Sequence, residues 1–183
     1  MKLLSTTTVA LFSLLSSIAP SHADWPDWRG PTKDGLVSES AGELPLEWDE
    51  ESGKNVIWKT PIHDEGHSSP VILEGKIWLT TATKVGKKMY VVCVEQKTGE
   101  ILLDRLVFEN AEPEPLGNPV NNYAAPSCVV EPGRVYVHFG TYGTVCLDSG
   151  SFAEIWRRTD INCRHYRGPG SSPLLHGDQL ILS

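Results

Sequence analysis

The chain has 183 residues, 40% of them hydrophobic and 21% charged, and its formal net charge at pH 7 is −7. An acidic surface repels phosphate backbones and anionic lipid headgroups, which argues against nucleic-acid binding and membrane-surface binding. The length suits one ordinary domain, but 13 prolines and 16 glycines interrupt the chain too often for long helices.

The first 23 residues have the pattern of a secretory signal peptide. Lys2 precedes the uncharged, mainly apolar run 3–18, and small residues precede the expected cleavage site after Ala23. The run is shorter than the roughly 20 apolar residues of a membrane-spanning helix. Asp24, not a cysteine, follows the site, so no lipid anchor is expected. We therefore expect an exported protein, periplasmic or extracellular, without a membrane span.

A motif of two small residues and a proline occurs three times after the signal peptide. The copies are Ser68-Ser69-Pro70, Ala124-Ala125-Pro126 and Ser171-Ser172-Pro173. Each copy leads into a short apolar run, a glycine turn and a second apolar run. The copies are spaced about 50 residues apart, which is close to the period of a four-stranded propeller blade.

The first two copies continue into a second hairpin. The runs Tyr90–Glu95 and Gly143–Asp148 each end in an acidic residue and pass through a glycine-containing turn into another apolar run. They are rich in β-branched and aromatic residues, and helical periodicity is absent. The sequence therefore predicts an all-β fold, an incomplete β-propeller of four-stranded antiparallel blades with about two and a half blades present. A two-sheet sandwich is the alternative, but it does not require a repeated motif.

The repeat pattern divides the chain into segments. We expect a signal peptide at 1–23, a lead-in segment at 24–53, a closing strand at 54–61, blade one at 67–108, blade two at 122–160 and the start of blade three at 170–183. The closing strand matches the end of a repeat but precedes the first motif, as a strand donated to the last blade would. Since the third copy stops within its first hairpin, we expect an N-terminal fragment. Such a fragment should be poorly stable alone, because repeats stabilise one another.

These features resemble the pyrroloquinoline-quinone-like (PQQ-like) β-propeller repeat. That repeat is found in quinoprotein dehydrogenases and in the assembly factor of the outer-membrane β-barrel machinery. The resemblance rests on the Ser-Ser-Pro motifs, the glycine turns, the acidic-residue hairpins, the terminal tryptophans and the lead-in Asp24–Pro31, and it covers residues 24–183. It implies a propeller with further blades, but not an activity, because one fold hosts many functions.

The cofactor that the resemblance suggests is pyrroloquinoline quinone with calcium. Quinoprotein dehydrogenases of this kind use an adjacent cysteine pair, which this sequence lacks. Glu109, Asn121 and Asn122 are loop residues that nothing ties to calcium. Quinone and calcium binding is therefore allowed, through residues outside this sequence, but unsupported. No catalytic or cofactor-binding residue is predicted, and the sequence leans away from an enzyme.

Two other patterns bear on metals and disulfides. His63 and His67 are four residues apart, but they lie in a proline- and glycine-containing loop and not in a helix that would direct both to one ion. Cysteines 93, 128 and 146 lie in apolar strand patterns, where a small buried side chain is expected. Three disulfide connectivities are open, and we expect Cys146–Cys163.

The aromatic residues in strand positions should pack between blades. They are Trp58, Trp78, Tyr136 and Trp156.

Polar residues just before each small-small-proline motif form the candidate binding surface. The motif should begin the innermost strand of each blade, so these residues should gather at one mouth of the central channel. The candidates are His67, Asn121, Asn122, Tyr123, His165, Tyr166 and Arg167. The acidic, proline-rich loop 109–121 lies beside them in sequence and is typical of binding excursions. Ordinary solvated loops are the alternative.

The function that this pattern favours is a non-catalytic, exported propeller scaffold that binds proteins or other cell-envelope components. The alternative is a periplasmic quinoprotein (PQQ-dependent) oxidoreductase whose active-site residues lie in the missing part. A propeller that binds carbohydrate or another polymer is a third hypothesis.

Overall fold

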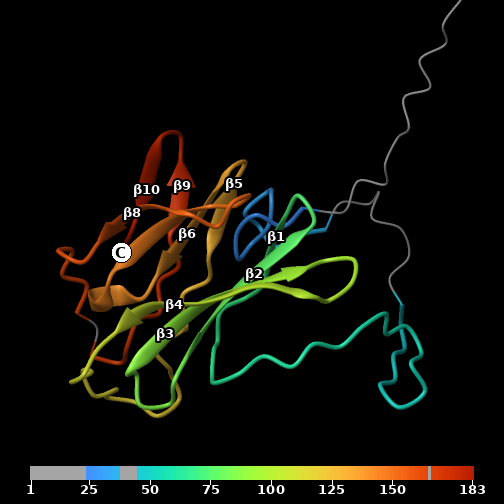
Figure 1. Ribbon diagram of the computed structural model, residues 1–183, viewed down its shortest axis with the longest axis horizontal. Coiled ribbons are helices and arrows are strands. Elements are labelled where there is room, and N and C mark those ends of the chain that lie inside the picture. Colours follow the sequence, from blue (N-terminus) through green and yellow to red (C-terminus); the bar gives the residue numbers. More distant parts are fainter. Residues whose placement is uncertain (1–23, 38–44, 165) are drawn as a thin grey trace, which may run out of the picture.

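The computed structural model describes residues 24–37, 45–164 and 166–183. The predicted signal peptide, part of the lead-in segment and the candidate residue His165 lie outside the described residues. In the described part of the chain, no helix is both long and apolar enough to cross a membrane. The regular structure is almost entirely β (Figure 1).

The first sheet is blade one. Its four antiparallel strands follow one another in chain order: β1 (Val71–Leu73), β2 (Lys76–Ala82), β3 (Lys88–Glu95) and β4 (Ile101–Glu109). Glu74 and Gly75 both have positive φ between β1 and β2, the geometry of a two-residue hairpin turn whose twist matches that of the strands. The pairing of β3 with β4 contains two register shifts, as β-bulges would give.

The second sheet is blade two. It has the same order and direction: β5 (Val129–Glu131), β6 (Arg134–His138), β7 (Thr144–Asp148) and β8 (Glu154–Arg158). A 3₁₀ turn, η2 (Gly140–Tyr142), joins β6 to β7. A hairpin of β9 (Leu174–His176) and β10 (Gln179–Ile181) begins blade three. The predicted all-β fold of four-stranded antiparallel propeller blades, two of them with the start of a third, is confirmed.

The main hydrophobic core lies between blade one and blade two. Trp78 and Cys93 of blade one, and Val135 and Phe139 of blade two, are fully or almost fully buried in one cluster. The faces of the two sheets thus remove each other's apolar side chains from water, which is the main stabilising contribution in such a layered structure. A smaller cluster joins blade two to the hairpin of blade three through Val129, Tyr136, Cys146, Trp156, Leu175 and Leu180.

Serine hydroxyls link successive blades at the small-small-proline motifs. The backbone N–H of Ser69 in blade one donates to Oγ of Ser127 in blade two at 2.8 Å. The backbone N–H of Ser127 donates in turn to Oγ of Ser172 in blade three at 3.0 Å. We call these two contacts the hub bonds. Ser69 and Ser172 directly precede the proline of their motifs, whereas Ser127 directly follows its proline, so the two bonds join different positions of the repeat.

The segment predicted as a closing strand runs along blade one without joining it. Residues 56–61 have no regular strand pairing. Their anchor is Trp58, whose indole N–H donates to the carbonyl of Gln96 at 2.9 Å. The ring lies over Gly99, where an added Cβ would approach it to 2.6 Å. Donation of this segment to a last blade stays a prediction.

The predicted Cys146–Cys163 disulfide is wrong, because all four cysteines are free thiols. Cys146 is fully buried in β7 beside Tyr136, whereas Cys163 lies in the connection after β8, beside Pro169 and Tyr142. The expected burial of the other strand cysteines is confirmed. Desolvation raises the pKa of Cys146 to about 11 and those of Cys93 and Cys128 to about 12.

Candidate functional site

The connections that lead into the three inner strands contact one another in succession. The backbone N–H groups of His67 and Ser68 both donate to the carbonyl of Ala124, at 3.1 Å. The side-chain amide of Asn121 donates to the carbonyls of Arg167 and Pro169, at 2.8 and 3.1 Å. The three segments therefore follow one another in blade order at one end of the sheets.

Three of the candidate residues have internal roles. Besides donating to the next connection, Asn121 accepts the N–H of Asn122 through its side-chain oxygen. The side-chain oxygen of Asn122 accepts the N–H of Ala124 at 2.9 Å, and Asn122 is 7% exposed. Such side-chain-to-backbone bonds fix the turn into the inner strand. The two asparagines thus shape the connection between blades more than they present a surface.

Tyr123 also points inward. Its hydroxyl donates to the carbonyl of Glu114 at 2.7 Å, and its ring meets that of Tyr142 edge-on at 6.0 Å between centroids. Gly86, in the turn between β2 and β3, makes room for the ring, because a Cβ there would lie 2.4 Å from it. Burial raises the pKa values of both tyrosines, so both phenols stay neutral at physiological pH.

The long loop after β4 is fastened over these tyrosines. The N–H of Glu114 donates to the Tyr142 hydroxyl at 2.9 Å, and the N–H of Gly117 donates to the carbonyl of Tyr166 at 2.9 Å. The Glu114 carboxylate pairs with Arg164 at 3.1 Å. The loop therefore connects blade one, blade two and the entry to blade three, and three of the residues that hold it, Glu114, Tyr142 and Arg164, are not individually indicated by the sequence. Neither Glu114 nor Arg164 stands in a recognisable spacing.

These contacts frame an open groove of about 420 Å³, lined by Glu114, Pro115, Gly117, Arg164 and Tyr166. Tyr166 is 81% exposed on its rim. We call this feature the mouth groove. His67 and Arg167 are likewise exposed, so these two and Tyr166 are the described candidates that face solvent. Exposed tyrosine and arginine beside a carboxylate is a composition typical of protein-recognition surfaces.

The residues considered for calcium do not fit that ion. The side-chain oxygens of Asn121 and Asn122 are engaged by backbone N–H groups. Glu109 lies 4.0 Å from Lys88, a cation that competes with a metal for the carboxylate. Calcium needs six to eight oxygen ligands, and in the described residues no group of three or more His, Cys, Asp or Glu side chains is arranged to hold a metal ion.

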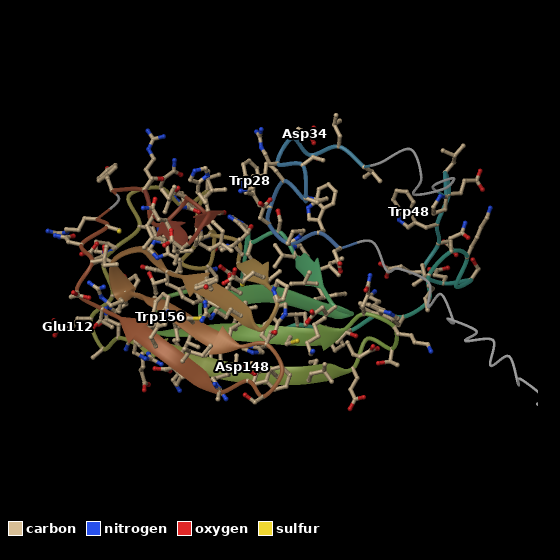
Figure 2. All side chains as sticks on the ribbon, turned by 90° about the horizontal axis from the view of Figure 1, so that it is seen from above. Trp28, Asp34, Trp48, Glu112, Asp148 and Trp156 are labelled. Atoms are coloured by element: carbon tan, nitrogen blue, oxygen red, sulfur yellow. The ribbon has the colours of Figure 1, made fainter. Side chains whose placement is uncertain are left out.

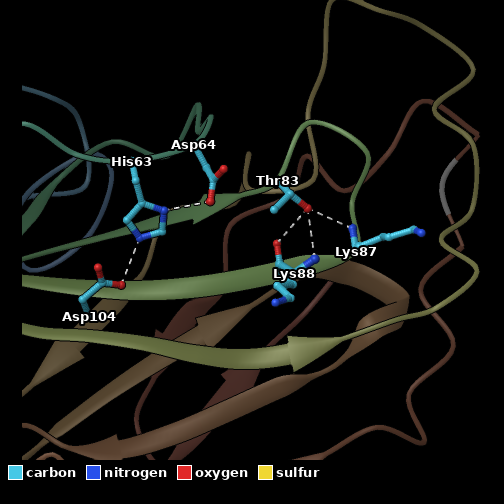
Figure 3. A network of polar contacts seen from close by, with 6 residues as sticks. All are labelled: His63, Asp64, Thr83, Lys87, Lys88 and Asp104. Atoms are coloured by element: carbon cyan, nitrogen blue, oxygen red, sulfur yellow. Dashed lines mark hydrogen bonds and ion pairs between the residues drawn. The ribbon is translucent and has the colours of Figure 1, made fainter.

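The histidine pattern in the loop before blade one forms a different structure (Figure 3). Nδ1 of His63 lies 2.7 Å from Asp64 and Nε2 lies 3.0 Å from Asp104 of β4, so both ring nitrogens face carboxylates. The ring also meets Tyr90 edge-on, with centroids 4.7 Å apart. The hydrogen bonds to Asp104 and Asp64 raise the pKa of His63. This cluster, which we call the His63 latch, ties the loop to blade one.

Figure 3 also shows how the neighbouring turn is built. The Thr83 hydroxyl oxygen accepts the backbone N–H groups of Lys87 and Lys88, at 3.0 and 3.1 Å. These bonds hold the turn between β2 and β3, in which Gly86 receives the Tyr123 ring. The turn therefore supports the mouth groove indirectly, through the tyrosine pair beneath the long loop.

Comparisons with known proteins complete the description. No family model and no curated protein matches the sequence. Similar solved structures include a europium-containing methanol dehydrogenase, with 15% identity and a TM-score of 0.47, covering 63% of this chain and 19% of that one. Quinohemoprotein alcohol dehydrogenases from Pseudomonas putida (12%, TM-score 0.44, covering 67% and 17%) and Comamonas testosteroni (12%, TM-score 0.43, covering 64% and 17%) are also similar.

The chain spans less than a fifth of the length of each of these structures. Likeness at this level decides nothing about activity, which has to be argued from the residues themselves.

Proposed function

We propose that this chain is part of an exported, non-catalytic propeller scaffold that binds a protein or another cell-envelope component at the mouth groove. The proposal is supported by the way loop 109–121 is built. Its hydrogen bonds to Tyr142 and to the Tyr166 carbonyl hold it on two blades. A long loop fixed on a rigid scaffold presents a binding surface with little loss of entropy on association.

The observation that carries the proposal is the exposure of Tyr166 beside the Glu114–Arg164 ion pair. A tyrosine that is 81% exposed gains much apolar contact when a partner covers it, and its hydroxyl can still bind water or a polar group. The ion pair is itself largely solvated, with the Arg164 side chain 72% exposed. Its contribution to stability is therefore small, and both charges are accessible to a partner.

A photo-crosslinking residue at position 166 of the full-length protein tests the proposal in intact cells. We expect discrete adducts from position 166 and none from position 97, since Lys97 lies in the turn between β3 and β4 at the other end of blade one. Replacing Arg164 by Ala in the position-166 protein should lower the adduct yield by about tenfold, as loss of an interface arginine often does. Equal adducts from both positions would contradict a specific surface.

The quinoprotein alternative has a direct test of its own. Pyrroloquinoline quinone and calcium are added to the full-length protein, and bound quinone is measured by its absorbance after gel filtration. On the proposal made here no stoichiometric binding is expected. Retention of one quinone per chain would favour the oxidoreductase and would leave the mouth groove as a secondary surface.

A further inference from the structure

Residues 24–37, the first part of the lead-in segment, lie beside β1 of blade one (Figure 1). The backbone N–H of Trp25 donates to the carbonyl of Ile72, and the N–H of Ile72 donates to the carbonyl of Trp25, both at 2.7 Å. β1 uses its other edge to pair with β2. Trp25 therefore pairs with the innermost strand on the side that faces the propeller axis.

The same segment reaches the next two blades at the equivalent position. Ile72, Val130 and Leu175 are the middle residues of β1, β5 and β9. The N–H of Val130 donates to the carbonyl of Pro26 at 2.9 Å, and Nζ of Lys33 donates to the carbonyl of Leu175 at 2.8 Å. One short stretch thus contacts the same residue position in three successive inner strands.

These contacts give backbone N–H groups on the free edges of β1 and β5 a hydrogen-bond acceptor. Val130 is 3% exposed with the segment in place, and the carbonyl of Pro26 is the hydrogen-bond partner that its buried N–H needs there. Pro26 has no N–H, so it can accept from β5 but cannot continue a strand ladder. The chain turns directly afterwards, with the N–H of Gly30 donating to the carbonyl of Asp27 at 3.0 Å.

We propose that the inner edges of the blades form a peptide-binding site of the β-augmentation type, which residues 24–35 of this chain occupy as an axial plug. An extended peptide adds to a strand edge through main-chain hydrogen bonds, as Trp25 and Pro26 do here. Figure 2 shows Trp28 and Asp34 of the plug on the side of the molecule away from the core of the sheets. This inference goes beyond the mouth groove and does not depend on a partner there.

Two glycines of the plug provide a matched test. Gly30 has a φ of +76°, and an added Cβ would lie 2.7 Å from the Trp25 ring. Gly35 has a φ of +81°, but nothing lies within 4 Å of an added Cβ. Alanine at either position therefore meets the same backbone strain, whereas alanine at position 30 also displaces Trp25.

The experiment is residue-resolved hydrogen exchange on the full-length protein and its Gly30→Ala and Gly35→Ala variants. We expect the amides of Ile72 and Val130 to exchange at least about tenfold faster in Gly30→Ala and to change little in Gly35→Ala. Val137, in the core between the blades, should stay protected in both. Equal exchange of Ile72 and Val130 in the two variants would overturn the proposal.

A second variant and a binding measurement guard against a purely structural effect. Trp25→Pro removes the N–H that donates to Ile72. A fluorescent peptide spanning residues 24–35 should bind Gly30→Ala and Trp25→Pro at least tenfold more tightly than it binds the unaltered protein, because the site has been vacated. No binding to either variant, or loss of Val137 protection in either, would show that the segment is an inseparable part of the core and not an occupant.

Discussion

Blade one and blade two have the same strand order, but their outer faces are covered differently. Trp78 and Tyr136 hold equivalent positions, each paired with the first residue of its inner strand. Trp78 is 1% exposed and packs edge-to-face on Phe152 of blade two. Tyr136 packs on Trp156 of its own blade and donates its hydroxyl to Glu131.

Trp78 thus has its aromatic partner in the following blade, whereas the aromatic partner of Tyr136 belongs to the same blade. Trp78 belongs to the core between blades one and two, whereas Tyr136 belongs to the smaller cluster with the β9–β10 hairpin and also lines an open groove of about 460 Å³. Repeats of this kind derive much of their stability from contacts with their neighbours. Equivalent residues should therefore differ in energetic importance wherever their cover differs.

Replacing the two aromatic residues tests this directly. Trp78→Ala should lower the free energy of unfolding by about 3–5 kcal/mol, because it empties a fully enclosed site. Tyr136→Ala should cost less, since Tyr136 also lines the open groove and its hydroxyl binds Glu131. Urea denaturation followed by tryptophan and far-UV signals measures both. Equal losses would show that the next blade does not decide the packing energy.

A smaller effect is expected at Gly143, which directly precedes β7 of blade two and lies against blade one. Gly143 has a φ of 140°, and a Cβ there would lie 2.7 Å from the Phe108 ring of blade one and from the Arg158 carbonyl. Gly143→Ala should cost about 3 kcal/mol through backbone strain and overpacking. Gly133, with a φ of +81° and nothing within 4 Å, is the control, and its replacement by Ala should cost about 1 kcal/mol. Similar thermal midpoints for the two variants would contradict close contact at Gly143.

The smallest effect concerns the His63 latch, which only blade one has among the described residues. Its hydrogen bonds raise the folded-state pKa of His63 above the ordinary value of 6.5. The stabilisation is therefore complete below about pH 6.5 and is lost as the pH rises through the folded-state pKa. The side chain is 39% exposed, so we expect less than about 1 kcal/mol.

This difference is measured as the gap in unfolding free energy between the unaltered protein and His63→Ala at pH 6 and pH 8. Asp104→Asn, which keeps the shape of the Asp104 side chain, should bring the pKa of His63 closer to 6.5. A gap that widens toward pH 8 would reverse the sign and refute the latch.

Much of the fold could be predicted because the information is local. Glycine turns, β-branched runs and the repeated proline motif each specify a hairpin within a few residues, and hairpins follow all three motifs. The contacts of Trp25 with Ile72 and of Trp58 with Gln96 were not predictable, since each joins distant residues through backbone carbonyls that carry no sequence signal.

For the candidate site, too, the arrangement of the repeats was predictable, but the contacts of individual side chains were not. The meeting of the three connections follows from the repeat, but polarity alone did not reveal that Asn121, Asn122 and Tyr123 bind the protein's own backbone. An asparagine that fixes a turn and one that faces a partner look identical in a sequence. The disulfide prediction failed for a related reason, since strand alternation places Cys146 inside a sheet interface but does not locate Cys163.

The hub bonds have a consequence for how proteins of this architecture change size. Each bond joins a blade only to its immediate neighbour, through one backbone N–H and one hydroxyl. The serine stands before the motif proline in blades one and three and after it in blade two, so an inserted repeat would keep both bonds only if its own serine stood on the matching side. A change in the number of repeats therefore has to preserve the serine position of each neighbouring unit if the units are to stay joined in this way.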